Sequence, residues 1–116
     1  MSEKQSPIFS KTYDFILWLL NHTETFPKSE RFRMARRLED SAFHFYELLI
    51  ETAHSEHKHH NLIKADMELD KLRLYIRMCN SRGLTKPNQY HYAAECIIEI
   101  GKLLGGWIKS VSVSGV

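Results

Sequence analysis

Residues 27–55 read PKSERFRMARRLEDSAFHFYELLIETAHS, and their apolar side chains return every three or four positions. The series consists of Ala35, Leu38, Ala42, Phe45, Leu49 and Ala53. This spacing places them on one face of an α-helix. Pro27 suits the first turn, where a missing N–H costs nothing, and Ser29 can cap the helix with its hydroxyl. The pattern therefore predicts one long helix over about residues 27–55.

Three further stretches show helical spacing, over about residues 8–22, 61–82 and 87–109. The clearest seam lies in the third of the four helices and consists of Leu62, Ala65, Leu69, Leu72, Ile76 and Cys79. Such a repeat is typical of a helix packed against other helices. Gly83 suits the end of this helix. Because the connections are short, the sequence predicts an all-α fold, an up-down-up-down four-helix bundle, in a single domain over residues 1–116.

Glycines mark the fourth helix. Gly101 lies on its apolar face, where glycine costs about 1 kcal/mol relative to alanine, so we expect another backbone to approach closely there. Gly105 and Gly106 are expected to disturb the helix near its end. We expect Trp107 to pack its ring on a neighbouring helix. Residues 110–116 are expected to form a flexible tail.

Two features predict contacts with other subunits. The first helix is apolar nearly all round, and the second carries a further apolar flank made of Phe32, Phe43, Tyr46 and Ile50. A lone bundle would leave this surface exposed, and exposed apolar patches of several hundred Å² usually mark interfaces. We therefore expect a closed ring of identical subunits.

The net charge is only +2, but basic residues cluster at the start of the second helix. Lys28, Arg31, Arg33, Arg36 and Arg37 lie within three turns, and Glu30 is the only acid among them. The cluster predicts a surface that binds RNA or DNA without sequence preference. Arg73 and Arg77, on the outer side of the third helix, would add to this surface if that helix lies alongside.

The same arginines have a plainer interpretation as a solvated helix face. Asp70 and Arg73 are spaced for an ion pair within the helix, which supports the helix modestly. Arg31, by contrast, falls in line with Ala35 and Leu38, on the packed side of a continuous helix. An acid of a neighbouring helix or subunit could pair with it there.

Catalytic and cofactor-binding motifs are missing from the sequence. It has no Gly-rich phosphate loop, no Gly-x-Ser-x-Gly elbow, no His-Glu-x-x-His pair and no Cys-x-x-Cys. We therefore expect neither enzyme activity nor a cofactor. The histidines between His54 and His60 leave a metal-binding bundle as an alternative function. They lack a regular ligand spacing, so we assign no metal ligand.

Export signals and membrane spans are also missing. The first residues are polar, without the apolar run of a signal peptide. The longest apolar run, Phe15–Leu20, is too short to cross a bilayer. Cys79 and Cys96 occupy apolar helix positions and are interpreted as buried reduced thiols. We expect a cytoplasmic protein that does not enter membranes.

Two motifs resemble a known family. The sequence Phe26-Pro27-Lys28-Ser29-Glu30-Arg31-Phe32, continuing to Arg37-Leu38-Glu39, resembles the start of the second helix in the Avd accessory proteins of diversity-generating retroelements. The sequence from Ile100 to Lys109, which contains Gly105-Gly106-Trp107, resembles the end of their last helix. The four-helix proteins encoded in intervening sequences of bacterial 23S ribosomal RNA genes are similar too.

The resemblance implies a four-helix bundle that assembles as a ring-like homopentamer. It implies partners as well, namely the retroelement's reverse transcriptase and nucleic acid, during the error-prone copying of template RNA into cDNA that diversifies a target gene. Catalysis would belong to the reverse transcriptase. Lys28, Arg31 and Arg37 match basic residues of the family, and Gly105, Gly106 and Trp107 match its terminal motif, whereas Arg33 and Arg36 are additional here.

Two functions from different classes therefore remain open. One is an accessory subunit that binds a reverse transcriptase together with RNA and DNA. The other is a self-assembling four-helix protein of the ribosomal intervening-sequence kind, with no reverse transcriptase partner. The gene neighbourhood separates them, since only the first predicts an adjacent reverse transcriptase gene with paired template and variable repeats.

Overall fold

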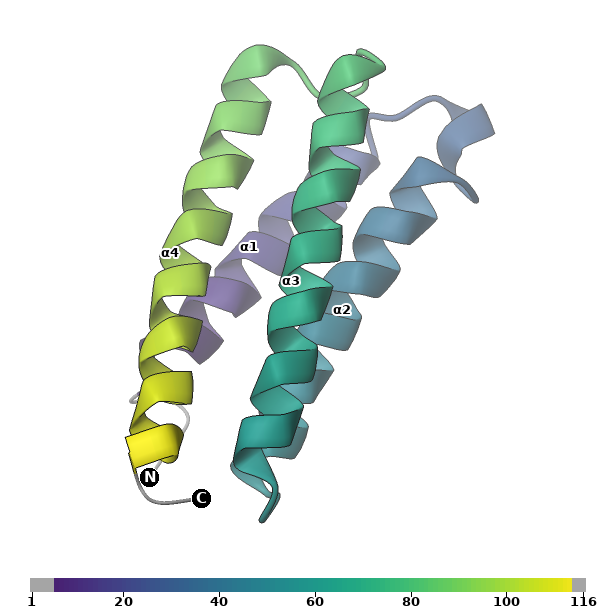
Figure 1. The fold of residues 1–116 in the computed structure, drawn as a ribbon. Coiled ribbons are helices and arrows are strands. Elements are labelled where there is room, and N and C mark those ends of the chain that lie inside the picture. The colour runs from purple at the N-terminus through teal and green to yellow at the C-terminus, as the bar shows by residue number, and fades with distance from the viewer. Residues whose placement is uncertain (1–5, 114–116) are drawn as a thin grey trace.

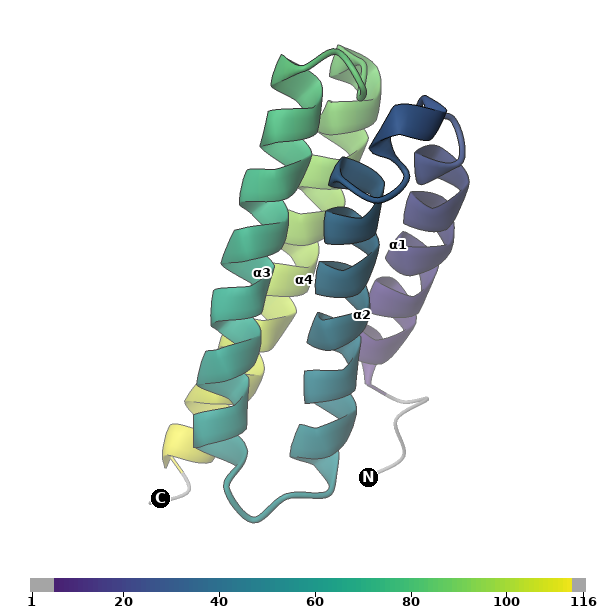
Figure 2. The same ribbon diagram turned by 90° about the vertical axis from the view of Figure 1, so that its right-hand side faces the viewer.

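A computed structural model describes residues 6–113 as four α-helices and one short 3-10 helix (Figure 1). The elements are α1 (Pro7–Thr23), η2 (Lys28–Glu30), α2 (Met34–Ala53), α3 (Lys58–Ser81) and α4 (Pro87–Val113). Consecutive α-helices run antiparallel in a bundle that measures 47 × 24 × 22 Å. α2 packs on α1 and α3, and α4 closes the bundle against α3 and α1 (Figure 2). No strand occurs among residues 6–113, so the predicted all-α four-helix architecture is confirmed.

The core is built from the helix seams that the sequence predicts. It contains Ala35, Leu38, Ala42, Phe45 and Leu49 of α2 and Leu62, Ala65, Leu69, Leu72, Ile76 and Cys79 of α3. α1 adds Phe15 and Leu19, and α4 adds Ile97 and Leu104. Burying one such large apolar side chain stabilises the fold by about 1.5–3 kcal/mol. The bundle is therefore held together by packing more than by helix propensity.

The second helix begins later than predicted, because the chain turns at residues 31–33. Pro27 is extended, Lys28–Glu30 form η2, and α2 starts only after Arg33. Arg33 has a φ of −116° and a ψ of −103°, which are not helical values. The predicted continuous helix over residues 27–55 is therefore wrong at its start.

The charge of Arg31 explains this interruption. A continuous helix would place Arg31 in line with Ala35 and Leu38, and an unpaired guanidinium is costly to bury on that face. In the structure Arg31 is exposed, and Glu30 turns inward instead. Glu30 is only 3% exposed, and its Oε2 accepts a hydrogen bond of 2.6 Å from Arg82 Nη2. This bond clamps η2 to the residue that follows α3.

The end of α3 is closed by the predicted glycine cap. Gly83 has a φ of +79°, in the left-handed region. Its amide donates to the Asn80 carbonyl and the Leu84 amide donates to the Cys79 carbonyl, which are the hydrogen bonds of a Schellman cap. Cys79 itself is fully buried. Burial raises the pKa of its thiol to about 11, and the Glu30 carboxylate adds to the shift.

α4 continues through the glycine pair that the sequence marks as a disturbance. Residues 110–113 are helical rather than a flexible tail, and residues 114–116 lie outside the described part of the chain. Gly105 and Gly106 are exposed, and a Cβ at either position would meet no atom within 4 Å. Leu104 and Trp107, on either side of the pair, pack against the core. These tertiary contacts outweigh the low helix propensity of glycine.

Candidate functional site

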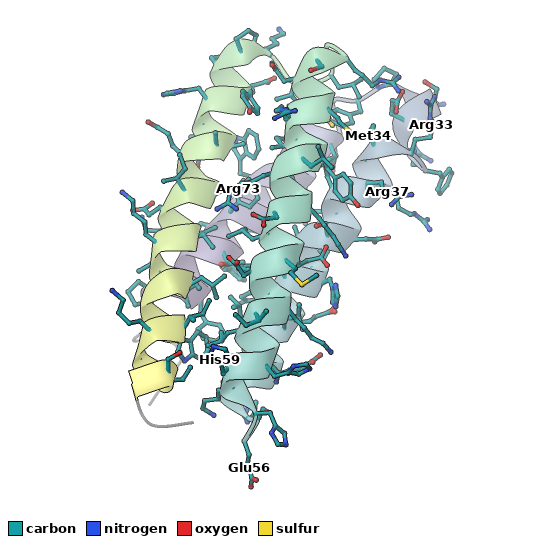
Figure 3. The ribbon with its side chains drawn as sticks, viewed as in Figure 1. Arg33, Met34, Arg37, Glu56, His59 and Arg73 are labelled. Atoms are coloured by element: carbon teal, nitrogen blue, oxygen red, sulfur yellow. The ribbon has the colours of Figure 1, made fainter. Side chains whose placement is uncertain are left out.

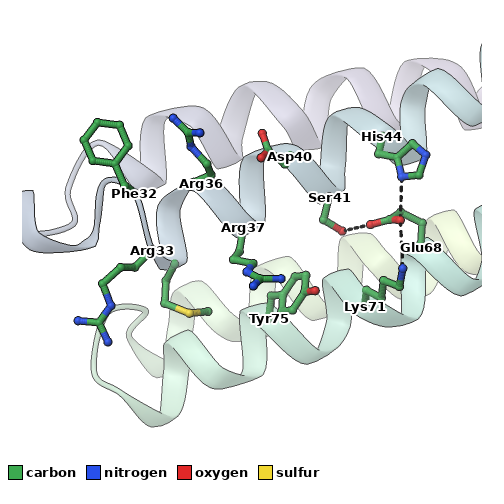
Figure 4. Close-up of a pocket in the computed structure, with 11 residues that line it drawn as sticks. Phe32, Arg33, Arg36, Arg37, Asp40, Ser41, His44, Glu68, Lys71 and Tyr75 are labelled. Atoms are coloured by element: carbon green, nitrogen blue, oxygen red, sulfur yellow. Dashed lines mark hydrogen bonds and ion pairs between the residues drawn. The ribbon is translucent and has the colours of Figure 1, made fainter.

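An open groove between α2 and α3 gathers three of the predicted basic residues (Figure 4). Its volume is about 860 Å³. The lining comes from the turn before α2, from the N-terminal half of α2 and from the facing side of α3, and consists of Phe32, Arg33, Met34, Arg36, Arg37, Asp40, Ser41, His44, Glu68, Lys71 and Tyr75. The late start of α2 shapes this groove, because the turn carries Phe32 and Arg33 to its edge.

The floor of the groove is a buried carboxylate with its own partners. Glu68 is only 6% exposed. Ser41 Oγ donates a hydrogen bond of 2.7 Å to Glu68 Oε2, and His44 Nδ1 lies 2.9 Å from Glu68 Oε1. Lys71 Nζ lies 3.8 Å from Glu68 Oε1 (Figure 4). A buried carboxylate is stable only when it is hydrogen-bonded and paired in this way. The three side chains therefore compensate Glu68 without using the arginines.

The arginines at the rim face aromatic rings. The guanidinium carbon of Arg36 lies 5.2 Å from the centre of the Phe32 ring, and that of Arg37 lies 5.9 Å from the centre of the Tyr75 ring. Within residues 6–113, neither guanidinium has an acidic partner in an ion pair. Cation–π contacts at exposed sites contribute about 0.5–1 kcal/mol and leave the positive charge in place. The rim therefore presents positive charge that is available to an anion.

The remaining basic residues of the predicted cluster lie beside the groove or farther away. Arg33 lines the groove edge, where its Nη1 is 3.7 Å from Glu30 Oε2. Lys28 on η2 and Arg31 in the turn are exposed but do not line the groove.

Arg73 and Arg77 lie in a different groove, between α3 and α4. This second groove is smaller, at about 370 Å³, and is mainly apolar, with Leu74, Ile76, Tyr90, Ala94, Ile97 and Ile98 beside Asp70 and the two arginines. Figure 3 shows Arg37 on the α2 side of α3 and Arg73 on the α4 side. Arg73 and Arg77 therefore do not extend the basic cluster of α2.

The side chain of Arg73 is already engaged within the subunit. It forms an ion pair with Asp70, one turn earlier on α3. It also covers Gly101 of α4, where a Cβ would lie 2.8 Å from Arg73 Nη2. The expectation that another backbone approaches Gly101 is therefore wrong, since a side chain fills the space.

Sequence reasoning missed the α3 wall of the groove, made by Glu68, Lys71 and Tyr75. A usable signal existed, because Glu68 stands between Ala65, Leu69 and Leu72 of the packed seam. An acid at such a position needs partners from a neighbouring helix. Lys71 and Tyr75 lie near Glu68 on the same face of the helix.

The terminal motif contributes one contact within the subunit. The half-buried Trp107 ring lies 6.1 Å from the Phe9 ring of α1, as the sequence predicts for a packed tryptophan. The space beside Gly105 and Gly106 is open, since a Cβ at either position would meet no atom within 4 Å. A role of Gly105 and Gly106 in contacts between subunits stays a prediction.

Neither a cluster of potential metal ligands nor a membrane-spanning helix occurs among residues 6–113. No three histidine, cysteine or acidic side chains in this range lie close enough to hold a metal ion. His54, His57, His59 and His60 are exposed around the connection between α2 and α3. No helix in the described range is long and apolar enough to cross a membrane.

Sequence comparison decides the family. The family model described as bAvd-like matches residues 7–111. The chain belongs to the bAvd-like family. The resemblance to Avd accessory proteins that the two motifs predict is thereby confirmed. This is a family of non-catalytic accessory proteins associated with the retroelement machinery. No curated protein matches the chain.

Proposed function

We propose that this chain is a non-catalytic accessory subunit of a diversity-generating retroelement. It binds the reverse transcriptase, the template RNA and the cDNA, and it supports mutagenic reverse transcription and retrohoming in the cytoplasm. The observation that carries the proposal is the pair Arg36 and Arg37, which have no acidic partner among residues 6–113 and stand at the rim of a groove in a bAvd-like chain.

The composition of the groove supports binding to the nucleic-acid backbone. Four cations, Arg33, Arg36, Arg37 and Lys71, face two carboxylates, Asp40 and Glu68, and Glu68 is already compensated. Contacts between such cations and phosphates are insensitive to sequence and weaken as salt rises. The groove therefore suits binding to template RNA or cDNA of any sequence.

Two separate apolar surfaces support assembly into a ring. One carries the exposed Tyr13 and Leu17 of α1 and Phe43 and Ile50 of α2, and the other carries Ile63, Met67, Leu74 and Met78 of α3 and Ile98 of α4. The two surfaces lie on opposite sides of the bundle, because α2 packs on α3 and α1 packs on α4. Different surfaces that bind each other give a head-to-tail interface, which forms a ring when the rotation between neighbouring subunits closes. By family likeness the ring is a homopentamer.

Size exclusion coupled to light scattering tests the assembly. We expect one species larger than a dimer, which persists at micromolar concentration. A stable monomer or an isologous dimer at that concentration contradicts the ring. Leu17→Ser and Leu74→Ser, one on each surface, should each break the ring, whereas Ser10→Ala, a conservative change at an exposed position, should not.

Co-purification tests the partner. The chain is co-expressed with the reverse transcriptase that the proposal expects to be encoded beside it, and cDNA synthesis is measured on the template RNA. We expect the enzyme to co-purify and long cDNA products to depend on this chain. The double variant Arg36→Gln, Arg37→Gln should shorten these products, and the matched exposed variant Arg77→Gln should not. If the enzyme neither co-purifies nor depends on the chain, the self-assembling protein without a reverse transcriptase partner becomes the better function.

A further inference from the structure

We propose that the α2–α3 groove binds single-stranded nucleic acid by stacking bases on Phe32 and Tyr75, in preference to duplex. The proposal rests on the nucleic-acid binding proposed above and specifies the form of the ligand. The observation that carries it is that an aromatic ring on each wall of one groove contacts an arginine, Phe32 with Arg36 and Tyr75 with Arg37.

Phe32 supplies an aromatic surface that the fold itself does not use. It is 71% exposed, more than any other large apolar side chain of the described residues. It stands in the turn between η2 and α2, and the clamp between Glu30 and Arg82 holds η2, just before this turn, against the end of α3. The guanidinium of Arg36 lies over the ring and most of the ring remains open (Figure 4). A base that stacks on Phe32 would therefore have its phosphate near Arg36.

Tyr75 repeats this arrangement on the opposite wall. It extends from α3 into the groove, half-buried, with the guanidinium of Arg37 over its ring (Figure 4). The two rings thus come from opposite walls, Phe32 from the turn before α2 and Tyr75 from α3, whereas both arginines come from α2, and all of them line one open space. Lys71, which compensates Glu68, stands one turn before Tyr75 on the same wall.

This combination matches the requirements of an unpaired strand. Proteins that bind single strands join a positive groove, which follows the backbone, to aromatic side chains that stack on bases. Stacking tolerates any sequence because every base has a π-face. A duplex hides those faces inside its own stack, so only the cations of the groove would act on it. Asp40, the exposed carboxylate on the α2 wall, further weakens a contact made through phosphates alone.

Fluorescence anisotropy with three labelled probes of equal length tests the proposal on the full chain. The probes are an oligothymidylate, the same backbone with abasic sites, and a duplex. We expect the oligothymidylate to bind most tightly. Phe32→Ala should weaken its binding by about tenfold, within the usual contribution of one stacked base. The abasic probe, which has phosphates but no bases, should bind Phe32→Ala and the unchanged chain alike.

Tyr92→Ala is the matched control, because Tyr92 is an exposed aromatic residue of α4 that lies outside the groove and outside the two apolar surfaces proposed for assembly. It should leave the affinity for all three probes unchanged. Phe32 is too exposed for its truncation to unfold the chain, and circular dichroism checks this point.

The outcomes separate this proposal from the function on which it rests. If the chain binds all three probes equally and Phe32→Ala changes none of them, stacking is overturned while nucleic-acid binding stands. If Tyr92→Ala weakens binding as much as Phe32→Ala does, the groove is not the stacking site. If the chain binds none of the probes, both the proposed nucleic-acid binding and the proposed stacking are overturned.

Discussion

The two grooves beside α3 both contain arginines, yet they use them differently. Arg36 and Arg37 in the α2–α3 groove face aromatic rings and have no ion pair within the described chain. Arg73 in the α3–α4 groove is paired with Asp70 and covers Gly101. The arginine of the α3–α4 groove is thus engaged by other residues of the same subunit, whereas the two arginines of the α2–α3 groove remain available to a ligand.

The position of the nearest acid explains the difference. Asp70 precedes Arg73 by one turn, and an acid on the N-terminal side of a base gives the more favourable helical pair. Asp40 follows Arg36 and Arg37 instead, which is the less favourable order. An arginine cluster is therefore a better sign of ligand binding when no acid stands one turn before it.

The largest effect should come from the clamp between Glu30 and Arg82, just before the turn that carries Phe32 and Arg33 to the α2–α3 groove. Arg82→Ala removes the main partner of the buried Glu30 carboxylate, and we expect the free energy of unfolding to fall by about 3 kcal/mol. Arg77→Ala, in the α3–α4 groove, should change it by less than about 0.5 kcal/mol. Urea unfolding followed by circular dichroism measures both. Equal losses for the two variants would remove the distinction between the grooves.

Removing one carboxylate from each groove should give the next largest difference. Glu68→Ala leaves the buried Ser41 hydroxyl without its partner, so we expect a loss of about 2 kcal/mol in the free energy of unfolding. Asp70→Ala breaks only an exposed pair, worth about 0.5 kcal/mol or less. Chemical unfolding of both variants at one pH makes the comparison. A costlier Asp70→Ala would show that the α3–α4 pair carries more of the fold than its exposure indicates.

These contrasts also show which features of the molecule can be predicted from its sequence. The seam from Leu62 to Cys79 was predicted in full, because a repeat of three and four fixes the buried face of a helix. The α2–α3 groove was not predicted, because the contact between Tyr75 and Arg37 depends on how α3 is rotated about its own axis against α2. The start of α2 was missed for another reason. Helix signals at Pro27 and Ser29 are local, whereas the burial of Glu30 depends on Arg82, far along the chain.

A smaller effect is expected on nucleic-acid affinity. Arg36→Gln with Arg37→Gln should weaken binding of a single strand by about tenfold at moderate salt and lower the salt dependence by about one ion for each lost phosphate contact. Arg73→Gln with Arg77→Gln should leave both quantities unchanged. Anisotropy titrations over a series of salt concentrations provide the measurement. If Arg73→Gln with Arg77→Gln lowers the salt dependence as much as Arg36→Gln with Arg37→Gln, the two grooves do not differ in phosphate binding.

The smallest effect should come from Gly101. Gly101→Ala gains up to about 1 kcal/mol in helix propensity, but the new Cβ displaces the guanidinium of Arg73. That guanidinium ends a flexible side chain, so we expect a slight rise in melting temperature rather than a loss. Gly105→Ala, in open space, gives the reference gain without any displacement. A clear fall in melting temperature for Gly101→Ala alone would show that Arg73 is held rigidly in its groove.

The buried thiol of Cys79 has a practical consequence for following this molecule in solution. Its pKa of about 11 leaves almost no thiolate at neutral pH, and its side chain is fully covered. A thiol reagent can therefore modify Cys79 only while the end of α3 is open, and the labelling rate reports how often that opening occurs. The half-buried Cys96 on α4 supplies an internal reference in the same experiment. The chain thus carries a native probe of local opening, placed near the bond between Glu30 and Arg82.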